Sequence, residues 1–444
     1  MLKRHYTKPI QMLHQRCLTL FLLFSITTQS NAQNVASLLG RWSGKIEKEK
    51  TWSVGVDFYM NENGVEALIS YPEYGLYDYL ADSLVITDTS VKIFFNDRSS
   101  PFEFNGIRGK KNISGTWKGL GQVARFSLLR YEKNYFGLRA IPVSFNNGDA
   151  KLKGTLVLPQ KIRGPYPAVV QVHGSGNQTR TEDFYRSRAY LLAKNGIAVL
   201  IYDRRGRGES SGEAVTMDLL AEDAIAGVKF LQTNEWIDKS KIGIMGFSQG
   251  GYVAPLAASM NKDISFIICG AAPSITPNEQ NDFNATNRLK RRKLPQDSIN
   301  YVMELRNQVS KYQFSGEGDK SKLESDLGNL KKMGWFSQTL LPSPPLTRYD
   351  QPIVDFLNFD PIPFWSKLTI PTLLLWGEMD ELVPAEKSKK EIVTALEHAG
   401  NKNVEARIFK NAGHGLALNS TEGWDWPRLA ENYHSLLVSW IKHQ

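Results

Sequence analysis

A serine flanked by glycines gives the strongest sign of chemistry in this sequence. It lies in the pentapeptide G-F-S-Q-G, residues 246–250, directly after the apolar stretch 241–245 and before small residues at 251–254. A sharp turn from a strand into a helix strains such a serine and presents its hydroxyl, and the flanking glycines avoid clashes in the turn. The positive end of the helix dipole adds to this environment. The pattern predicts that Ser248 is a catalytic nucleophile.

A serine nucleophile needs a general base, and histidine is the usual one. His414 lies in the glycine-flanked loop N-A-G-H-G, residues 411–415, after the strand-like stretch 404–409. Three further histidines lie in polar, helix-like stretches, which predicts surface positions for them: His398, His434 and His443. We therefore predict that His414 is the base.

The acid that orients the histidine is expected in a loop after a strand between Ser248 and His414. Asp380 fits, because it follows the apolar stretch 372–375 and precedes Val383-Pro384. Glu378 and Glu381 are rivals in the same loop, but Asp380 has the better position in the turn. The resulting chain order of serine, aspartate and histidine is that of the α/β-hydrolases, and it differs from the chymotrypsin and subtilisin orders.

A second glycine-rich loop, H-G-S-G at residues 173–176, follows the apolar stretch 168–172. Glycines let the backbone approach a tetrahedral intermediate, so that amide groups can point at its oxyanion. We predict one donor at the Ser175 amide, with Gly174 as its rival, and the other at the Gln249 amide. His173 is expected to brace this loop. No Cys, His, Asp or Glu accompanies it at metal spacing, so the sequence implies no metal and no cofactor.

From about residue 136 to 444 the chain resembles the α/β-hydrolase superfamily. It looks most like bacterial carboxylesterases that carry a His-Gly-Ser-Gly loop and an N-terminal β-rich extension. The stretch D-R-R-G-R-G-E-S, residues 203–210, is similar to the D-x-R-G-x-G-x-S stretch of these enzymes and of serine aminopeptidase-like hydrolases. We expect it to be architectural, with Asp203 and an arginine fixing the loop beside the nucleophile.

The resemblance implies hydrolysis of small acyl esters through an acyl-enzyme. One alternative is a serine peptidase of the aminopeptidase or prolyl-oligopeptidase type, which needs an acidic anchor for a peptide amino group. Three acids are candidates for that anchor: Glu279, Asp282 and Glu304. An alternative of another class is a surface- or carbohydrate-binding protein on an inactive hydrolase fold. It is disfavoured because all three residues of the triad are present.

The elements that position these residues read as an α/β fold. Continuous apolar runs are typical of strands buried on both faces of a mostly parallel sheet, and helix-like segments alternate with them, which indicates helices on both faces. The runs are 168–172, 197–202, 241–245, 265–269 and 371–376, and the helical segments are 188–194, 219–231 and 249–259.

A charged, helix-rich insertion at about 273–367 interrupts this alternation, with helices expected at 298–312 and 320–333. A segment this long between two strands is usually functional, and we predict a helical cap. Its larger apolar residues, such as Tyr301, Met303 and Trp335, either contact an acyl group or pack the cap itself. The catalytic domain with its insertion is expected at 134–444.

Residues 33–133 read as short strands separated by turn signals, which predicts a small all-β domain, either a sandwich or a barrel. The strands are expected at 40–46, 54–59, 83–86, 91–95 and 124–128. Aromatic residues are frequent here, among them Trp42, Trp52, Tyr71 and Trp117. They line either a ligand groove or, as we favour, the core of the β-fold.

Residues 1–32 resemble a secretory signal peptide, with a basic region, an apolar run at 18–26 and small residues before a cleavage site. We predict export to the periplasm or the medium, without stable membrane insertion after cleavage. Removal would leave Cys269 as the only cysteine. The chain has 444 residues and a formal charge of +9, four of these charges lying in the first 32 residues. The basic stretch 288–293 lacks interleaved aromatic residues, so we predict a solvated helix face and no nucleic-acid partner. The sequence does not indicate an oligomeric state.

Overall fold

The structure is a computed structural model of the chain, and it divides into two compact units that are described separately. The first unit contains the described residues up to Tyr131 except Leu76, and the second contains Leu76 and those from Leu138 onward. The expected signal peptide at 1–32 and the expected domain boundary at 133/134 lie outside the described residues. These are 35–47, 51–61, 64–71, 76–95, 101–119, 121–131, 138–159, 164–176, 178–213, 216–418 and 429–444.

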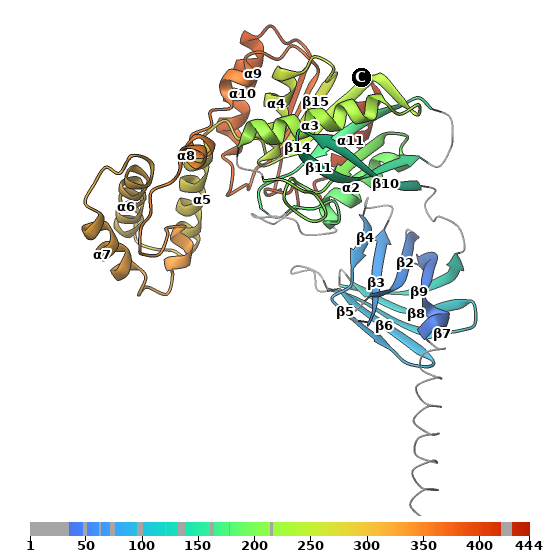
Figure 1. Cartoon of the computed structure of the whole chain (residues 1–444). Coiled ribbons are helices and arrows are strands. Elements are labelled where there is room, and N and C mark those ends of the chain that lie inside the picture. The colour runs from blue at the N-terminus through green and yellow to red at the C-terminus, as the bar shows by residue number, and fades with distance from the viewer. Residues whose placement is uncertain are drawn as a thin grey trace, which may run out of the picture. The chain divides into compact units, whose positions relative to one another are not determined.

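The first unit is one curled antiparallel sheet (Figure 1). Its order is β4-β3-β2-β1-β9-β8-β7-β6-β5, so each strand pairs with its neighbour in sequence except β4 with β5, and β1 pairs with β9. The strands are β1 (Gly40–Glu47), β2 (Trp52–Asn61), β3 (Gly64–Tyr71), β4 (Leu76–Leu80), β5 (Ser83–Ile86), β6 (Ser90–Phe95), β7 (Phe102–Arg108), β8 (Asn112–Gly119) and β9 (Gln122–Tyr131).

The concave side of this sheet is filled by aromatic and branched side chains. In β6 and β7 alternate residues are buried, as the period of a strand with one solvated face requires. Trp42, Tyr71 and Trp117 are 2% exposed or less, and the indole Nε1 of Trp117 donates to the Tyr71 hydroxyl at 3.2 Å. These aromatic residues are therefore core, as favoured, and do not line a ligand groove. Within the described residues, the expected small all-β domain is a single curled sheet with β4 and β5 at its two ends.

The second unit is built on an eight-stranded sheet of the α/β-hydrolase type. Its order is β10-β11-β13-β12-β14-β15-β16-β17, and of these strands β11 alone runs against the direction of the others. The strands are β10 (Leu138–Asn147), β11 (Ala150–Pro159), β12 (Tyr166–Val172), β13 (Ala198–Tyr202), β14 (Ile237–Phe247), β15 (Phe266–Gly270), β16 (Thr372–Gly377) and β17 (Val404–Phe409).

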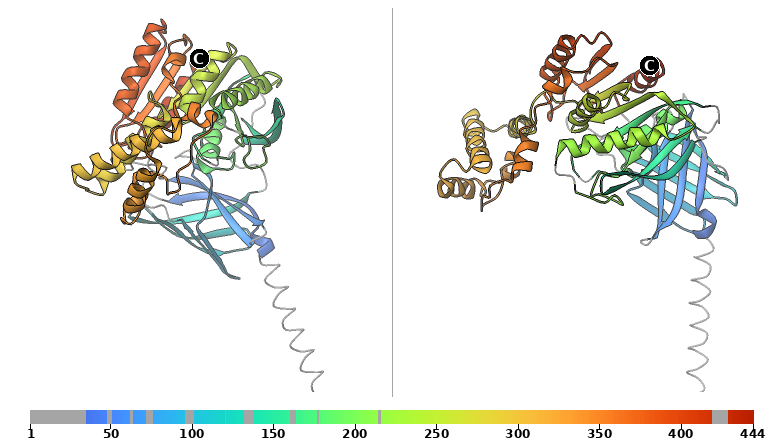
Figure 2. Two further views of the ribbon diagram at one scale, coloured as in Figure 1. Left: turned by 60° about the vertical axis from the view of Figure 1, so that its left-hand side comes forward. Right: turned by 45° about the horizontal axis from the view of Figure 1, so that its top comes forward.

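Helices cover both faces of this sheet (Figures 1 and 2). Val170 and Leu200 pack in the layer formed with α3, α4 and α10, whereas Val169 and Val199 pack in the layer formed with α2 and α11. Burial on both faces explains why these strands read as uninterrupted apolar runs. The helices are α2 (Asp183–Lys194), α3 (Met217–Gln232), α4 (Gly250–Met260), α10 (Ala385–His398) and α11 (Tyr433–Lys442).

The segment between β15 and β16 forms a helical lobe with a core of its own. Val302, Leu305 and Leu327 are buried in that core, and Met303 and Trp335 pack against it, whereas Tyr301 is 50% exposed. Packing within the lobe therefore accounts for most of the apolar residues considered for acyl contact. The elements are α5 (Pro277–Arg291), α6 (Gln296–Ser315), α7 (Lys320–Leu330), the 3₁₀ helix η3 (Phe336–Thr339), α8 (Gln351–Leu357) and α9 (Ile362–Trp365).

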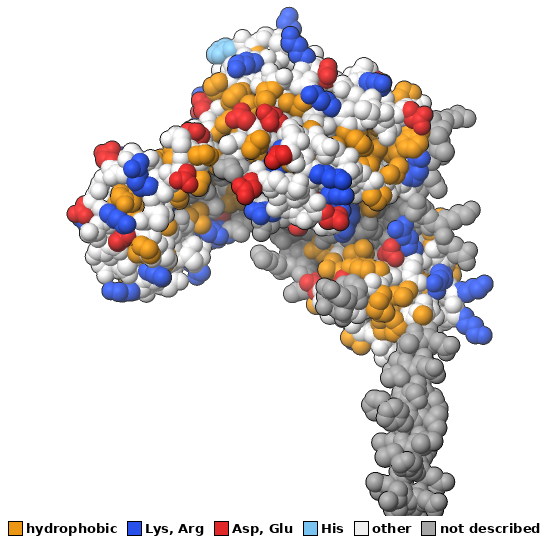
Figure 3. All heavy atoms as spheres, viewed as in Figure 1, with side chains coloured by type: hydrophobic (Ala, Val, Ile, Leu, Met, Phe, Trp, Pro, Cys, Tyr) orange, Lys and Arg blue, Asp and Glu red, His pale blue; other side chains and the backbone are white. Residues whose placement is uncertain are grey.

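Charges of both signs are interspersed on the lobe surface (Figure 3). On α7, Lys320 pairs with Glu324 and Lys322 with Asp326, each one helical turn apart. The basic stretch 288–293 occupies the last turn of α5 and the residues just after it, where cations complement the helix dipole. It is thus a helix terminus in a surface of mixed charge.

Candidate active site

Ser248 occupies the turn between β14 and α4, as the glycine pattern predicts. Its φ of 55° lies in the left-handed region, which a non-glycine residue adopts at a cost, and its amide donates to the carbonyl of Gly270 at 2.9 Å. A Cβ on Gly246 would lie 2.1 Å from the carbonyl oxygen of Gly250, so only glycine fits there. Ser248 is 9% exposed, so the residue is largely buried in this turn.

His414 and Asp380 form a buried pair. The Nδ1 atom of His414 lies 2.9 Å from Oδ2 of Asp380, and the two residues are 3% and 7% exposed. The other carboxylate oxygen, Oδ1, accepts hydrogen bonds from the amides of Leu382 at 2.8 Å and Val383 at 2.9 Å. With its second oxygen fixed by the backbone, the carboxylate is oriented toward the imidazole.

The two rival acids have other partners. Glu378 accepts a hydrogen bond from the amide of Asn411 at 2.9 Å. Glu381 pairs with Arg291 of α5 at 3.0 Å, and its carbonyl accepts from the Asn287 side chain at 3.0 Å. The structure therefore brings Asp380, and neither glutamate, to His414. It also ties the helical lobe to the loop that carries the acid.

The glycine-rich loop at 173–176 runs alongside Ser248. A Cβ placed on Gly174 would lie 3.9 Å from Cβ of Ser248. The Gly174 amide donates to the hydroxyl of Tyr185 at 2.8 Å. The amides of Ser175 and Gln249 have no acceptor within the part of the chain that the structure describes. This arrangement favours Ser175 over Gly174 as an available donor.

His173 is enclosed by aromatic rings and is held by the backbone. Its Nε2 atom bonds to the carbonyl of Tyr202, and its ring packs edge-on against Tyr185 and Tyr202 at centroid distances of 5.3 and 4.6 Å. Burial lowers the pKa of His173 to about 4. A neutral, enclosed imidazole of this kind braces the loop rather than exchanging protons near neutral pH.

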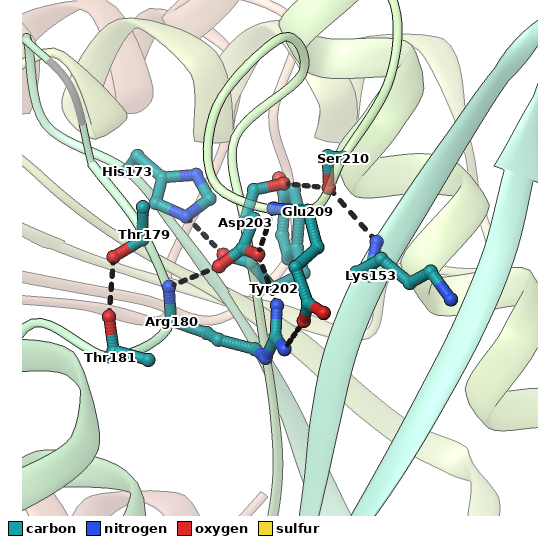
Figure 4. Close-up of polar contacts among 9 residues, drawn as sticks. All are labelled: Lys153, His173, Thr179, Arg180, Thr181, Tyr202, Asp203, Glu209 and Ser210. Carbon is teal, nitrogen blue, oxygen red and sulfur yellow. Dashed lines mark hydrogen bonds and ion pairs between the residues drawn. The ribbon is translucent and has the colours of Figure 1, made fainter. Parts of the chain in front are cut away.

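The loop after β13 is fixed by Asp203 (Figure 4). Its Oδ1 accepts from the amide of Arg180 at 2.9 Å, and its Oδ2 accepts from the amide of Glu209 at 2.9 Å and pairs with the Arg180 guanidinium. Ser210 closes the turn by donating its hydroxyl to the Asp203 carbonyl at 2.8 Å. The arginine expected to pair with Asp203 is thus Arg180, which lies outside the 203–210 stretch. No pattern in the sequence around Arg180 indicates this contact.

Arg204 and Arg205 follow Asp203 but take separate roles. Arg205 forms a buried pair with Asp223, with Nη2 2.6 Å from Oδ1. Arg204 instead contacts the residue after Ser248, and its Nη1 donates to Oε1 of Gln249 at 2.9 Å. From the sequence we predicted no role for Arg204, although this residue lies in the stretch 203–210.

The remaining expectations concern histidines and the acids of the insertion. His398 and His443 are exposed, as predicted, whereas His434 is partly buried against Tyr433, and burial lowers its pKa to about 4.

The acids considered as an anchor for a peptide amino group all have partners within the lobe. Glu279 forms a capping box with Thr276, Asp282 pairs with Arg306 at 2.7 Å, and Glu304 accepts from Gln308 at 2.9 Å.

The described residues contain no helix that is both long and apolar enough to cross a membrane. They also contain no group of three or more His, Cys, Asp or Glu side chains placed to hold a metal ion.

The chain is similar in sequence to several known proteins. The chain is 28% identical over 302 residues to esterase EstD of Thermotoga maritima, covering 64% of this chain and 63% of that protein. It is 37% identical over 121 residues to thiohydrolase aneE of Aspergillus aculeatus, covering 27% and 36%. The matches thus span less than two thirds of the length of these relatives.

A solved structure of the Pyrococcus furiosus esterase Pf2001 aligns with a TM-score of 0.45 and 21% identity, covering 71% of this chain and 96% of the esterase. The family model named BD-FAE matches residues 155–395, which is more than half of the chain and includes Ser175, Ser248 and Asp380. The chain therefore belongs to the BD-FAE family.

Proposed function

We propose that this protein is a serine hydrolase that cleaves carboxylic esters through an acyl-enzyme. The observation that carries the proposal is the oriented pair of His414 and Asp380, found in the same domain as a strained serine at a strand-to-helix turn. A base held by an acid, together with an activated serine, is the arrangement that acyl transfer requires. Membership of the BD-FAE family and the match to a protein named an esterase support the same activity.

In the proposed reaction, Nε2 of His414 takes the proton of Ser248 as Oγ attacks the ester carbonyl. Asp380 accepts from the Nδ1–H group, which keeps the imidazole in the tautomer whose Nε2 carries no proton. The amides of Ser175 and Gln249 stabilise the oxyanion of the tetrahedral intermediate. His414 then protonates the leaving alcohol and activates the water that releases the acid.

We favour ester cleavage over aminopeptidase activity because the acidic residues of the lobe already have partners. Glu279 caps its own helix, Asp282 is neutralised by Arg306, and Glu304 bonds to a neighbour on α6. A peptide amino terminus would have to displace one of these partners. We propose short to medium acyl esters as substrates, with the lobe as a cap that sets acyl-chain preference through its contact with the Asp380 loop. We also propose that the protein is exported.

The test is a panel of p-nitrophenyl esters of graded acyl length, run beside aminoacyl and prolyl anilides. We expect turnover of the shorter esters and much slower cleavage of the anilides. Efficient anilide cleavage with acetate and butyrate esters nearly untouched would instead establish a peptidase. A protein that neither turns over any ester nor reacts with a fluorophosphonate would be a binding protein on an inactive fold.

The role of the lobe has its own test. Replacing residues 296–340 with a short linker removes α6, α7 and η3 but keeps α5 and its contacts to Glu381. We expect a changed acyl-length profile and unchanged labelling of Ser248 by a fluorophosphonate. An unchanged profile would contradict the cap.

A further inference from the structure

The Arg204 side chain reaches the two backbone segments that carry the proposed oxyanion donors. Its Nη1 lies 2.9 Å from Oε1 of Gln249, 3.3 Å from the carbonyl oxygen of Gly174 and 3.4 Å from that of Gly176. Arg204 itself follows β13 and is 9% exposed. One guanidinium nitrogen therefore bridges the glycine-rich loop and the residue after the nucleophile.

The bridge is made by a cation whose contacts are all neutral. Among the ion pairs within the described residues, Asp203 is taken by Arg180 and Asp223 by Arg205, and none includes Arg204. A buried charge without a counter-ion costs stability, so a purely structural bridge is better made by a neutral side chain. The positive charge thus stays beside the loop instead of being neutralised by a carboxylate.

The contact with Gly174 acts directly on the Ser175 amide. The carbonyl of Gly174 and the N–H of Ser175 belong to one planar trans peptide, in which the two groups point in opposite directions. A donor that fixes the carbonyl on one side fixes the N–H on the other. Because hydrogen bonds along such a chain polarise one another, a cation on the carbonyl also makes the N–H a stronger donor.

We propose that Arg204 is a positioning residue of the oxyanion hole, which orients and polarises the Ser175 amide through the Gly174 carbonyl and aligns the Gln249 donor through its side chain. The proposal rests on the proposed ester hydrolysis and extends it. Arg204 touches neither the ester nor the nucleophile, so its contribution lies in the stabilisation of negative charge on the substrate oxygen.

The test compares Arg204→Gln and Arg204→Lys with Arg207→Gln. Arg207 is exposed in the same turn, and its one side-chain hydrogen bond within the described residues goes to the Gly206 carbonyl, so it controls for the loss of one positive charge. The measurements are kcat and KM for p-nitrophenyl butyrate, Ki for a trifluoromethyl ketone, and the midpoint of thermal unfolding. The ketone reports on the oxyanion hole because it forms a hemiketal oxyanion on the serine.

We expect Arg204→Gln to lower kcat by roughly 10–100-fold, less than the loss of a direct oxyanion donor. The Ki for the ketone should rise by a similar factor, while KM changes little. Arg204→Lys should recover part of the loss, and Arg207→Gln should match the parent. A purely structural role would lower the thermal midpoint without this parallel change in kcat and Ki. A folded Arg204→Gln protein with parental kcat and Ki would overturn the proposal.

Gln249→Met provides a second variant if Arg204→Gln does not fold. It removes one acceptor of Arg204 and keeps the Gln249 amide, so kcat and ketone affinity should fall together by a smaller factor, and unchanged values would contradict the bridge. A failure of the proposed ester hydrolysis can be told apart from a failure of the proposal for Arg204. If the parent protein binds the ketone but turns over no ester, the ester activity is refuted. The Ki values of the variants for the ketone then still decide the role of Arg204.

Discussion

Gly377 packs directly against the backbone of Gly413: a Cβ on Gly377 would lie 2.2 Å from the Gly413 carbonyl oxygen and 2.3 Å from that of Ala412. Gly377 ends β16, three residues before Asp380, and Gly413 precedes His414. The loops that carry Asp380 and His414 are therefore in direct backbone contact at a point that leaves no room for a side chain.

Gly377→Ala is expected to separate the two loops and to lower kcat by at least about tenfold, because small displacements of catalytic groups are costly. Gly328→Ala is the matched control, since a Cβ there, within α7, meets nothing within 4 Å. It should leave kcat unchanged and stabilise the helix by up to about 1 kcal/mol. Equal activity of the two variants would show that the contact does not set the site.

Ser248→Ala should abolish turnover and leave the fold intact, because it removes one oxygen from a residue held by its backbone amide. Loss of a triad nucleophile costs on the order of 10⁴–10⁶ in rate. A fluorophosphonate should label the parent protein and not the variant. Labelling that persists in the variant would place the nucleophile elsewhere.

Asp380→Asn should preserve the contacts of Oδ1 with the Leu382 and Val383 amides but present an amide to the imidazole. The histidine would then favour the unproductive tautomer, and kcat should fall by about 10³–10⁴. Glu378→Gln and Glu381→Gln are controls from the same loop. The assignment fails if Glu378→Gln is the crippling change and Asp380→Asn is mild.

His173 is expected to make the free energy of unfolding depend on pH. The unfolded chain protonates this residue near pH 6.5 and the folded chain only near pH 4, so the folded state loses stability as the pH falls through that window. The full effect is roughly 3 kcal/mol. Urea unfolding of His173→Asn between pH 7 and 4 should show a shallower decline than the parent, whereas exposed His398→Asn should follow the parent. Parallel curves for His173→Asn and the parent would contradict this.

Export should remove residues 1–32 and leave Gln33 as the first residue of the mature protein. N-terminal sequencing of protein recovered from the periplasm or medium measures this directly. A folded, active protein that retains Met1 or Met12 would assign the apolar run to the mature structure instead.

Residues of the candidate site could be predicted where the neighbouring sequence itself marks them. Ser248, Asp380 and His414 each follow a recognisable strand within a glycine-bearing or turn-forming segment, and all lie in the turns expected for them. Arg180 and Tyr185 were not predictable, because each acts through a contact made by the fold rather than by its neighbours in sequence. Asp203, which Arg180 contacts, is 23 residues away.

The first unit shows the same limit for the fold. The short runs predicted as strands overlap β1, β2, β5, β6 and β9, but β3, β4, β7 and β8 were not predicted. The two halves of the sheet, β1 to β4 and β5 to β9, are joined by the pairing of β1 with β9, for which Gly40–Glu47 must find Gln122–Tyr131 across the whole unit. A pairing of that range leaves no local signal.

The position of the lobe between β15 and β16 affects how the second unit folds. Ile267 of β15 faces Thr372 of β16 in the sheet, although about a hundred residues separate them. Closing a flexible loop of that length costs on the order of 4 kcal/mol in chain entropy. Because the lobe has its own hydrophobic core, we expect it to collapse first and bring the two strand ends together before they pair. Hydrogen-exchange labelling during refolding should protect amides of α6 before those of β16, and the reverse order would contradict this route.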